Sequence, residues 1–214
     1  MRPFRYIAVA LTAVLAGCAS EGELVVNQGV GITAVRSVCP AVGVPDYTGD
    51  ITLFRDAGTR TASNIDMVAT ITDVRSTCNE AGEQVYAEAT FNVVARRSDV
   101  GAAQQVTLPY FVSTLRGGNA IVTKKVGNVT LNFAPGEERT SAQGKAATYV
   151  NRADATLPDE IRERITRRRK PGDPDAALDP LADPQVREAV ARATFEMLIG
   201  FQLSDDQLAY NATR

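Results

Sequence analysis

The residue types most used for nucleophilic and metal chemistry are scarce in this chain: its 214 residues include three cysteines and no histidine. Histidine is the commonest general base and the commonest transition-metal ligand, so its absence excludes Ser-His-Asp and Cys-His catalysis. The sequence has no G-x-S-x-G motif, no G-x-x-x-x-G-K-S/T motif and no cluster of metal-ligand residues. A carboxylate pair of the glycosidase type stays open, because such partners meet only in the fold, but no pair stands out. The sequence therefore predicts a protein that is not an enzyme and uses no metal or cofactor.

The first cysteine, Cys18, follows a leader-like amino terminus. Two basic residues, Arg2 and Arg5, precede an apolar run over residues 6–16, and small residues follow that run. These are the features of a secretory signal peptide. The apolar run is too short to cross a bilayer as a helix, which takes roughly 20 residues.

Residues 15–18, Leu-Ala-Gly-Cys, resemble the lipobox of bacterial lipoproteins. The resemblance implies a signal peptide over residues 1–17, a diacylglyceryl cysteine at position 18, and a fatty acyl chain such as palmitate on the new amino terminus. Several acyl chains make a stable membrane anchor. In that family an aspartate after the cysteine indicates retention at the inner membrane; Ala19 stands there, so we expect the outer membrane, facing the periplasm. An ordinary cleaved leader with an unmodified Cys18 is the alternative.

Cys39 and Cys78 are the two remaining thiols. In an exported chain they predict a disulfide, because the periplasm is oxidising. Closing a loop of about 40 residues stabilises a fold by roughly 4 kcal/mol in the chain-entropy model. Two cysteines without histidine make a poor metal site, so the structural interpretation is favoured.

A basic run stands between residues 162 and 170 and contains six cations: Arg162, Arg164, Arg167, Arg168, Arg169 and Lys170. One interpretation is a surface for an anionic partner, such as lipid head groups, lipopolysaccharide phosphates or an acidic protein face. The other is a solvated helix end, where cations meet the helix dipole and downstream aspartates neutralise them. The second interpretation is favoured because exposed charges are usually solvated. The downstream aspartates lack the spacing of an EF-hand, so residues 171–184 are expected to form an acidic, proline-rich linker.

Residues 29–152 have the pattern of an all-β domain: short Val-, Ile-, Thr-, Tyr- and Phe-rich runs separated by turn residues. The clearest strand is 84–97, where apolar and polar residues alternate; it pairs with 64–77 in a long hairpin that has Cys78 near its tip. Further strands are expected near 30–38, 49–55, 104–115, 119–126, 128–133 and 145–150. This succession predicts an antiparallel sandwich of immunoglobulin or fibronectin-III type, with a closed barrel as the alternative.

A helical segment, residues 153–214, is expected after the β domain. One helix leads into the basic run, and a last helix begins after Ser204. Between them, a helix capped by Asp183 is predicted from Pro184 through Phe201, on an apolar stripe that begins at Val186. This helix is expected to cover a face or an edge of the sandwich, or else to dock a partner or the membrane surface.

These features together predict a non-enzymatic lipoprotein, anchored through Cys18 and a linker over residues 18–28. Its expected role is that of an accessory or scaffold in an envelope assembly, with an envelope protein as partner. The alternative is a binding module for a glycan, a lipid or a cell-wall fragment, which requires a concave pocket with converging polar groups. A carboxylate-based hydrolase is the third hypothesis. The net charge of -2 gives no basic field for nucleic acid.

Overall fold

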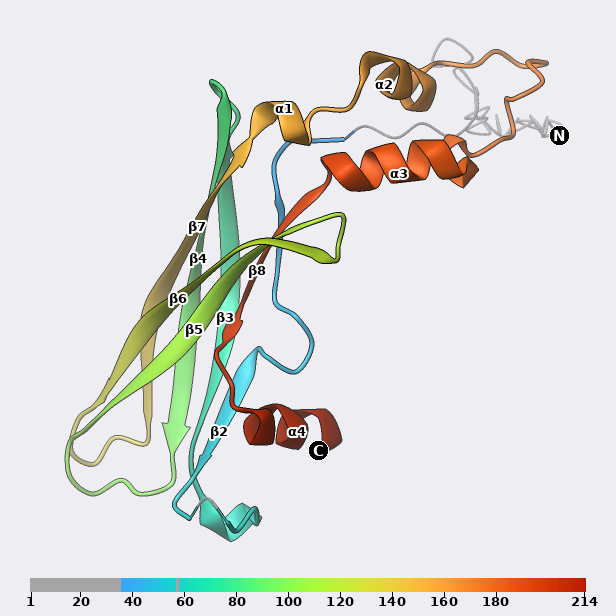
Figure 1. Cartoon of the computed structure of the whole chain (residues 1–214). Helices are drawn as coiled ribbons and strands as arrows, with labels where there is room; N and C mark the ends of the chain where they lie inside the picture. The colour runs from blue at the N-terminus through green and yellow to red at the C-terminus, as the bar shows by residue number, and fades with distance from the viewer. Residues whose placement is uncertain (1–35, 57) are drawn as a thin grey trace, which may run out of the picture.

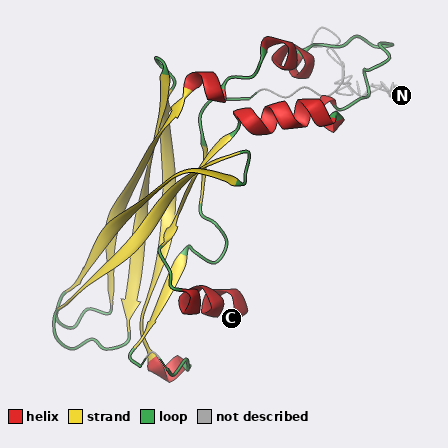
Figure 2. Ribbon diagram, in the orientation of Figure 1, coloured by secondary structure: helices red, strands yellow, loops and turns green. Residues whose placement is uncertain are grey.

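Figure 1 shows a computed structural model of the chain, which describes residues 36–56 and 58–214. The predicted signal peptide, Cys18 and the linker over residues 18–28 lie outside the described residues. Two β-sheets form an elongated body, the helices α1 (Arg152–Ala155), α2 (Asp159–Thr166) and α3 (Pro184–Ala193) gather at one end of it, and the last helix, α4 (Asp205–Thr213), lies beside β2 (Asp50–Phe54) (Figures 1 and 2). No helix in the described ranges has both the length and the hydropathy that a membrane span needs.

The fold is mainly β, with two four-stranded sheets. The first sheet is antiparallel and has the order β2 (Asp50–Phe54), β3 (Ile65–Asn79), β4 (Gln84–Arg97), β7 (Arg139–Asn151). The second has the order β1 (Ala41–Gly43), β8 (Phe195–Phe201), β5 (Gln104–Arg116), β6 (Ala120–Phe133). Its pairs are antiparallel except that β1 runs parallel to β8. The predicted two-sheet organisation is therefore confirmed.

The predicted long hairpin is confirmed as β3 and β4. Alternate residues of β4 are buried, among them Val85, Phe91 and Val93, so one face of the strand packs on the core, as its sequence pattern predicts. Gly82 lies in the turn between the strands with a φ of 87°, a left-handed conformation that favours glycine.

Other strand boundaries differ from the prediction. Residues 119–126 and 128–133 belong to one strand, β6, because Gly127 does not interrupt the ladder. The ring of Tyr110 on β5 lies over Gly127 and fills the space that a side chain would take. β7 also begins earlier than expected. Residues 36–38 of the predicted strand 30–38 are not in a strand, and the rest of that range lies outside the described residues.

The predicted helix through Phe201 is wrong in its second half. Helix α3 (Pro184–Ala193) ends at Ala193. Phe195–Phe201 form a strand, β8, which is an inner strand of the second sheet. Every second residue of β8 from Phe195 to Phe201 is buried. Met197 and Phe201 fit a helical stripe as well as an alternating one, because a short apolar run has no unique period. Hydrogen bonding to β5 and β1 on either side selects the strand.

Within the described residues, the α-helices are α1 (Arg152–Ala155), α2 (Asp159–Thr166), α3 and α4 (Asp205–Thr213), and short 3-10 helices cover Ala62–Asn64 and Pro180–Ala182. The N-caps predicted at Asp183 and Ser204 are confirmed, since Asp183 accepts a hydrogen bond from the backbone of Gln185 and Ser204 forms a capping box with Gln207. Thr156, which can cap a helix by its residue type, instead follows α1 as its C-cap, and α2 begins after Pro158. Helices α2 and α3 share a small apolar core of their own, formed by Leu157, Ile165, Val186 and Val190. The helices therefore pack on one another through this second core, separately from the core between the two sheets.

Aromatic rings fill gaps left by glycines in the core. Phe91 on β4 lies directly opposite Gly144 on β7, and Tyr110 on β5 lies opposite Gly127 on β6. The two rings meet edge to face between the sheets, with centroids 5.1 Å apart. The Tyr110 hydroxyl also donates a 2.6 Å hydrogen bond to the carbonyl of Lys145 on the opposite sheet.

Gly144→Ala tests this packing. A Cβ at position 144 would lie 2.2 Å from Cζ of Phe91, so the ring has to move. We expect the substitution to lower the free energy of unfolding by about 3 kcal/mol, which is in the upper part of the usual range for overpacking. Where a strand has room for the methyl group, replacing glycine by alanine stabilises the fold instead. Urea denaturation measures the difference. In a Phe91→Leu background, where the ring atoms are absent, the same substitution should cost much less; an equal cost in both backgrounds would contradict this account.

Candidate functional site

A pocket of about 300 Å³ lies where the helices join the sandwich, and we call it the helical-end pocket. Its walls come from residues 36–38, the turn after β3 and helices α1, α2 and α3. The pocket floor is apolar and consists of Val38, Ala155, Leu157, Ile165, Val190 and Ala193. The polar rim contains Arg36, Arg152, Arg162 and Glu80.

Two strands, one from each sheet, hold the helices of the pocket. β7 ends at Asn151, whose side chain accepts a hydrogen bond from the backbone of Ala153 and so begins α1. On the other sheet, α3 leads through Thr194 into β8. Phe195 at the start of β8 packs with Val150 and Ala155, so the two sheets meet directly beneath the pocket.

A disulfide between Cys39 and Cys78 ties one pocket wall to the sandwich, as the sequence predicts. It joins the segment that carries Arg36 to the end of β3, and its Cα–Cα distance of 6.1 Å is within the usual range. Ser37 extends this connection: its hydroxyl accepts a 3.0 Å hydrogen bond from the backbone of Cys39 and donates a 3.2 Å one to Glu80. The disulfide therefore fixes the position of the rim.

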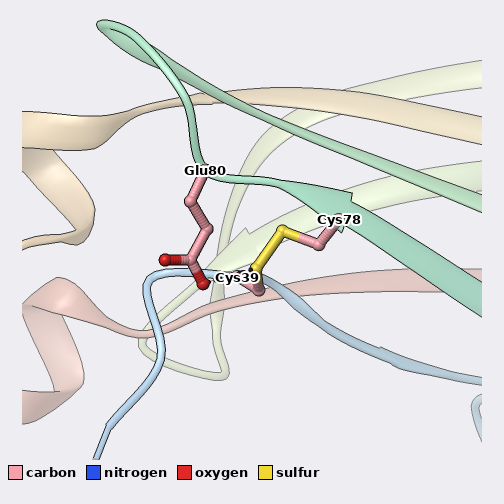
Figure 3. A group of neighbouring side chains, drawn as sticks. All are labelled: Cys39, Cys78 and Glu80. Carbon is pink, nitrogen blue, oxygen red and sulfur yellow. Dashed lines mark hydrogen bonds between the residues drawn. A yellow bond between two sulfur atoms is a disulfide. The ribbon is translucent and has the colours of Figure 1, made fainter.

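Glu80 and the two cysteines form the one group of potential metal ligands that the described residues bring together. Figure 3 shows the Glu80 carboxylate beside the disulfide, and its Oε1 lies 3.1 Å from the sulfur of Cys39. A metal site would need thiolates. The two sulfurs are bonded to each other, so neither is a thiolate, and of the three residues Glu80 alone lines the pocket.

Arg36 and Arg152 have no carboxylate partner among residues 36–56 and 58–214. Arg36 donates from Nη2 to the hydroxyl of Thr194 at 2.9 Å, and Arg152 donates from Nη1 to the backbone carbonyl of Glu80 at 2.7 Å. These bonds orient both guanidinium groups without neutralising them. Arg162 differs, since it forms an ion pair with Asp159 at 2.6 Å.

The hydroxyl groups around the rim each donate a hydrogen bond to another group of the protein. Thr156, Thr166 and Thr194 each donate to the carbonyl four residues earlier, at distances of 2.7 to 2.8 Å. The Ser37 hydroxyl donates to Glu80. The side-chain donors left for a ligand on this rim are therefore those of the guanidinium groups, chiefly of Arg36 and Arg152, which favours a ligand with an anionic group.

The predicted basic run does not form one open cationic surface. Helix α2 ends at Thr166, before most of the run, and three arginines pair with aspartates of the linker. These pairs are Arg164 with Asp183, and Arg167 and Arg169 with Asp175. Arg169 is only 3% exposed.

The other three cations of the run are exposed. Arg162 lines the pocket, and the backbone N–H of Lys170 donates to Asp173. The side chain of Arg168 forms no hydrogen bond or ion pair with another described residue.

Sequence reasoning missed Arg36, Arg152 and Glu80. Arg36 and Arg152 are isolated cations that lie more than a hundred positions apart, and no local pattern marks either of them. Their proximity results from the disulfide on one side and from the β7–α1 junction on the other. Cys18, the predicted lipidation site, lies outside the described residues.

No protein-family model matches the chain, and searches of curated proteins and of solved structures find no match either.

The pairing of the basic run predicts a pH effect. Partial burial raises the pKa of Asp175, but hydrogen bonds from Arg169 and Arg167 lower it more and leave that pKa below the ordinary aspartate value. This carboxylate therefore stabilises the fold above about pH 4, and the stabilisation is lost as the pH falls through the lower folded-state pKa. We expect Asp175→Asn to be less stable at pH 7, with a free energy of unfolding that falls less steeply below pH 4.

Urea titrations at a series of pH values measure this difference. Glu160→Gln is the matched control, because Glu160 is an exposed carboxylate of α2 without an ion pair among the described residues. Parallel pH profiles for Asp175→Asn and the parent chain would show that the linkage is absent.

Proposed function

We propose that this chain is a non-enzymatic, lipid-anchored binding protein of a bacterial envelope, and that it holds an anionic ligand in the helical-end pocket. The observation that carries the proposal is the pair Arg36 and Arg152, oriented on the rim above an apolar floor and without a carboxylate partner among the described residues. Charge-assisted hydrogen bonds to such groups contribute roughly 1.5–3 kcal/mol each, enough to select an anion.

The envelope location and the anchor rest on the leader. The lipobox resemblance at residues 15–18 supports acylation of Cys18 and the outer membrane as destination. The Cys39–Cys78 disulfide supports an oxidising compartment. An immunoglobulin- or fibronectin-III-type sandwich is part of the same proposal, supported by the two four-stranded sheets.

Native mass spectrometry of the protein purified from membranes tests the proposal. We expect the parent chain to carry a small anionic adduct, and its intact mass to show acylation at Cys18. Arg36→Gln combined with Arg152→Gln should lose the adduct. Arg139→Gln is the control, because Arg139 is exposed at the opposite end of β7, about 40 Å away at 3.4 Å per residue. A parent chain without an adduct, or a double variant that keeps it, would argue against the proposal.

A second candidate function is the accessory role in an envelope assembly. It is favoured by β6, an edge strand whose first half is exposed. Ile121, Val122 and Val126 are 66%, 54% and 60% exposed, and they give this edge an apolar surface. An exposed edge strand can pair with a strand of another protein. Lys124 and Lys125 offer a simpler account, since lysines on an edge discourage such pairing.

Photo-crosslinking in cells separates these two accounts of β6. With a photo-reactive amino acid in place of Val122, the accessory role predicts one stoichiometric crosslinked protein in the outer-membrane fraction. The same substitution at Tyr149, which is exposed on the other sheet, is the control and should capture nothing specific. If neither position gives a discrete product, β6 is a protected edge.

A further inference from the structure

We propose that the ligand of the helical-end pocket is an amphiphile with a single alkyl chain and an anionic head group, in the class of fatty acids and lysophospholipids. The alkyl chain lies on the pocket floor and the head group binds Arg36 and Arg152. This inference rests on the proposed function, since it names the ligand class for the same pocket.

The apolar part of the pocket lining suits an alkyl chain, whereas the rest of the lining is polar. The six residues of the pocket floor carry no polar side-chain atom. Ala155, Leu157, Ile165 and Val190 are buried, so they form a fixed surface. A sugar or a nucleotide would leave its hydroxyl or amide groups unpaired against this floor, which costs free energy.

The size of the pocket limits the ligand to one chain. Its volume of about 300 Å³ is at the lower end of the range for small-molecule sites. A lipid with two full acyl chains needs more space. The pocket therefore suits a single chain of intermediate length whose head group stays at the rim.

The rim determines the charge of the head group. Arg36 and Arg152 keep donors that no described carboxylate occupies, whereas Glu80 contributes one negative charge close to the disulfide. Two cations against one carboxylate leave the rim positive. Arg162 adds little, because Asp159 neutralises it.

The decisive experiment is a calorimetric titration of the full chain carrying Cys18→Ala with carboxylates of increasing length, below their micelle concentrations. Acetate, hexanoate, octanoate and decanoate are the probes, and decanol is the neutral counterpart. Each buried methylene should tighten binding about fourfold until the pocket is full. Octanoate and decanoate, which differ by two methylenes, should therefore differ about 15-fold. Decanol should bind more weakly than decanoate.

Substitutions on the rim and floor test the two parts of the site separately. Arg152→Gln should weaken decanoate at least about tenfold and leave decanol unchanged. Glu80→Gln should tighten decanoate, because it removes a negative charge and keeps the oxygen that accepts from Ser37. Ala193→Leu fills the floor and should shorten the chain length at which affinity stops rising. Arg139→Gln is the control, and thermal unfolding establishes that each variant is folded.

The outcomes distinguish this inference from the proposed function. A rise in affinity with chain length that depends on Arg152 supports both. Binding of acetate and decanoate with equal affinity, sensitive to Arg152, overturns the amphiphile and leaves an anion-binding pocket. If affinity rises with chain length but is the same in the Arg152 and Glu80 variants as in the parent chain, the assigned head-group site is overturned. Absence of binding for all probes up to millimolar concentration overturns both.

Discussion

The contact between Phe91 and Tyr110 is the interaction on which the rest of the structure depends. The two rings come from different sheets and meet edge to face, so they set the distance between the sheets. Each ring fits only because its cross-strand neighbour, Gly144 or Gly127, has no side chain. In isolation, glycine weakens a strand, and here the aromatic ring above it restores the lost packing. The distance between the sheets is therefore set by one aromatic–glycine pair in each sheet.

The sheet separation carries over to the helical end. Helix α1 continues from β7 in one sheet, while α3 leads into β8 in the other. The distance between these helices, and so the width of the helical-end pocket, follows from the spacing of the strands that hold them. A buried hydrogen bond between Thr114 and Thr148, 2.6 Å long, joins the two sheets near this end. The disulfide then adds the third wall. A rigid sandwich thus gives a loop-rich end the fixed geometry that a binding site requires.

Local patterns were enough to predict much of the fold and little of the site. Alternation predicts β4 because its buried face is regular, and the caps at Asp183 and Ser204 depend only on neighbouring residues. The β8 strand could not be predicted, since its apolar residues fit two periods and its partners lie far away in sequence. The pocket is still harder to predict from the sequence, because its residues come from distant parts of the chain. Arg36 and Arg152 are brought together by a disulfide and a sheet, neither of which leaves a mark near either residue.

The arginines of the described residues fall into groups according to the partners of their guanidinium groups. Arg97 is buried and donates to three backbone carbonyls, those of Glu137, Ala102 and Ala134, so its role is to hold loops. The arginines of the basic run pair with linker aspartates. Arg36 and Arg152 belong to neither group: they are exposed, so that water solvates their guanidinium groups and no counter-charge is required. Their remaining N–H donors face no described carboxylate, and part of the pocket lining beside them is apolar. An anion that brings its own apolar chain would contact both the donors and the apolar lining at once.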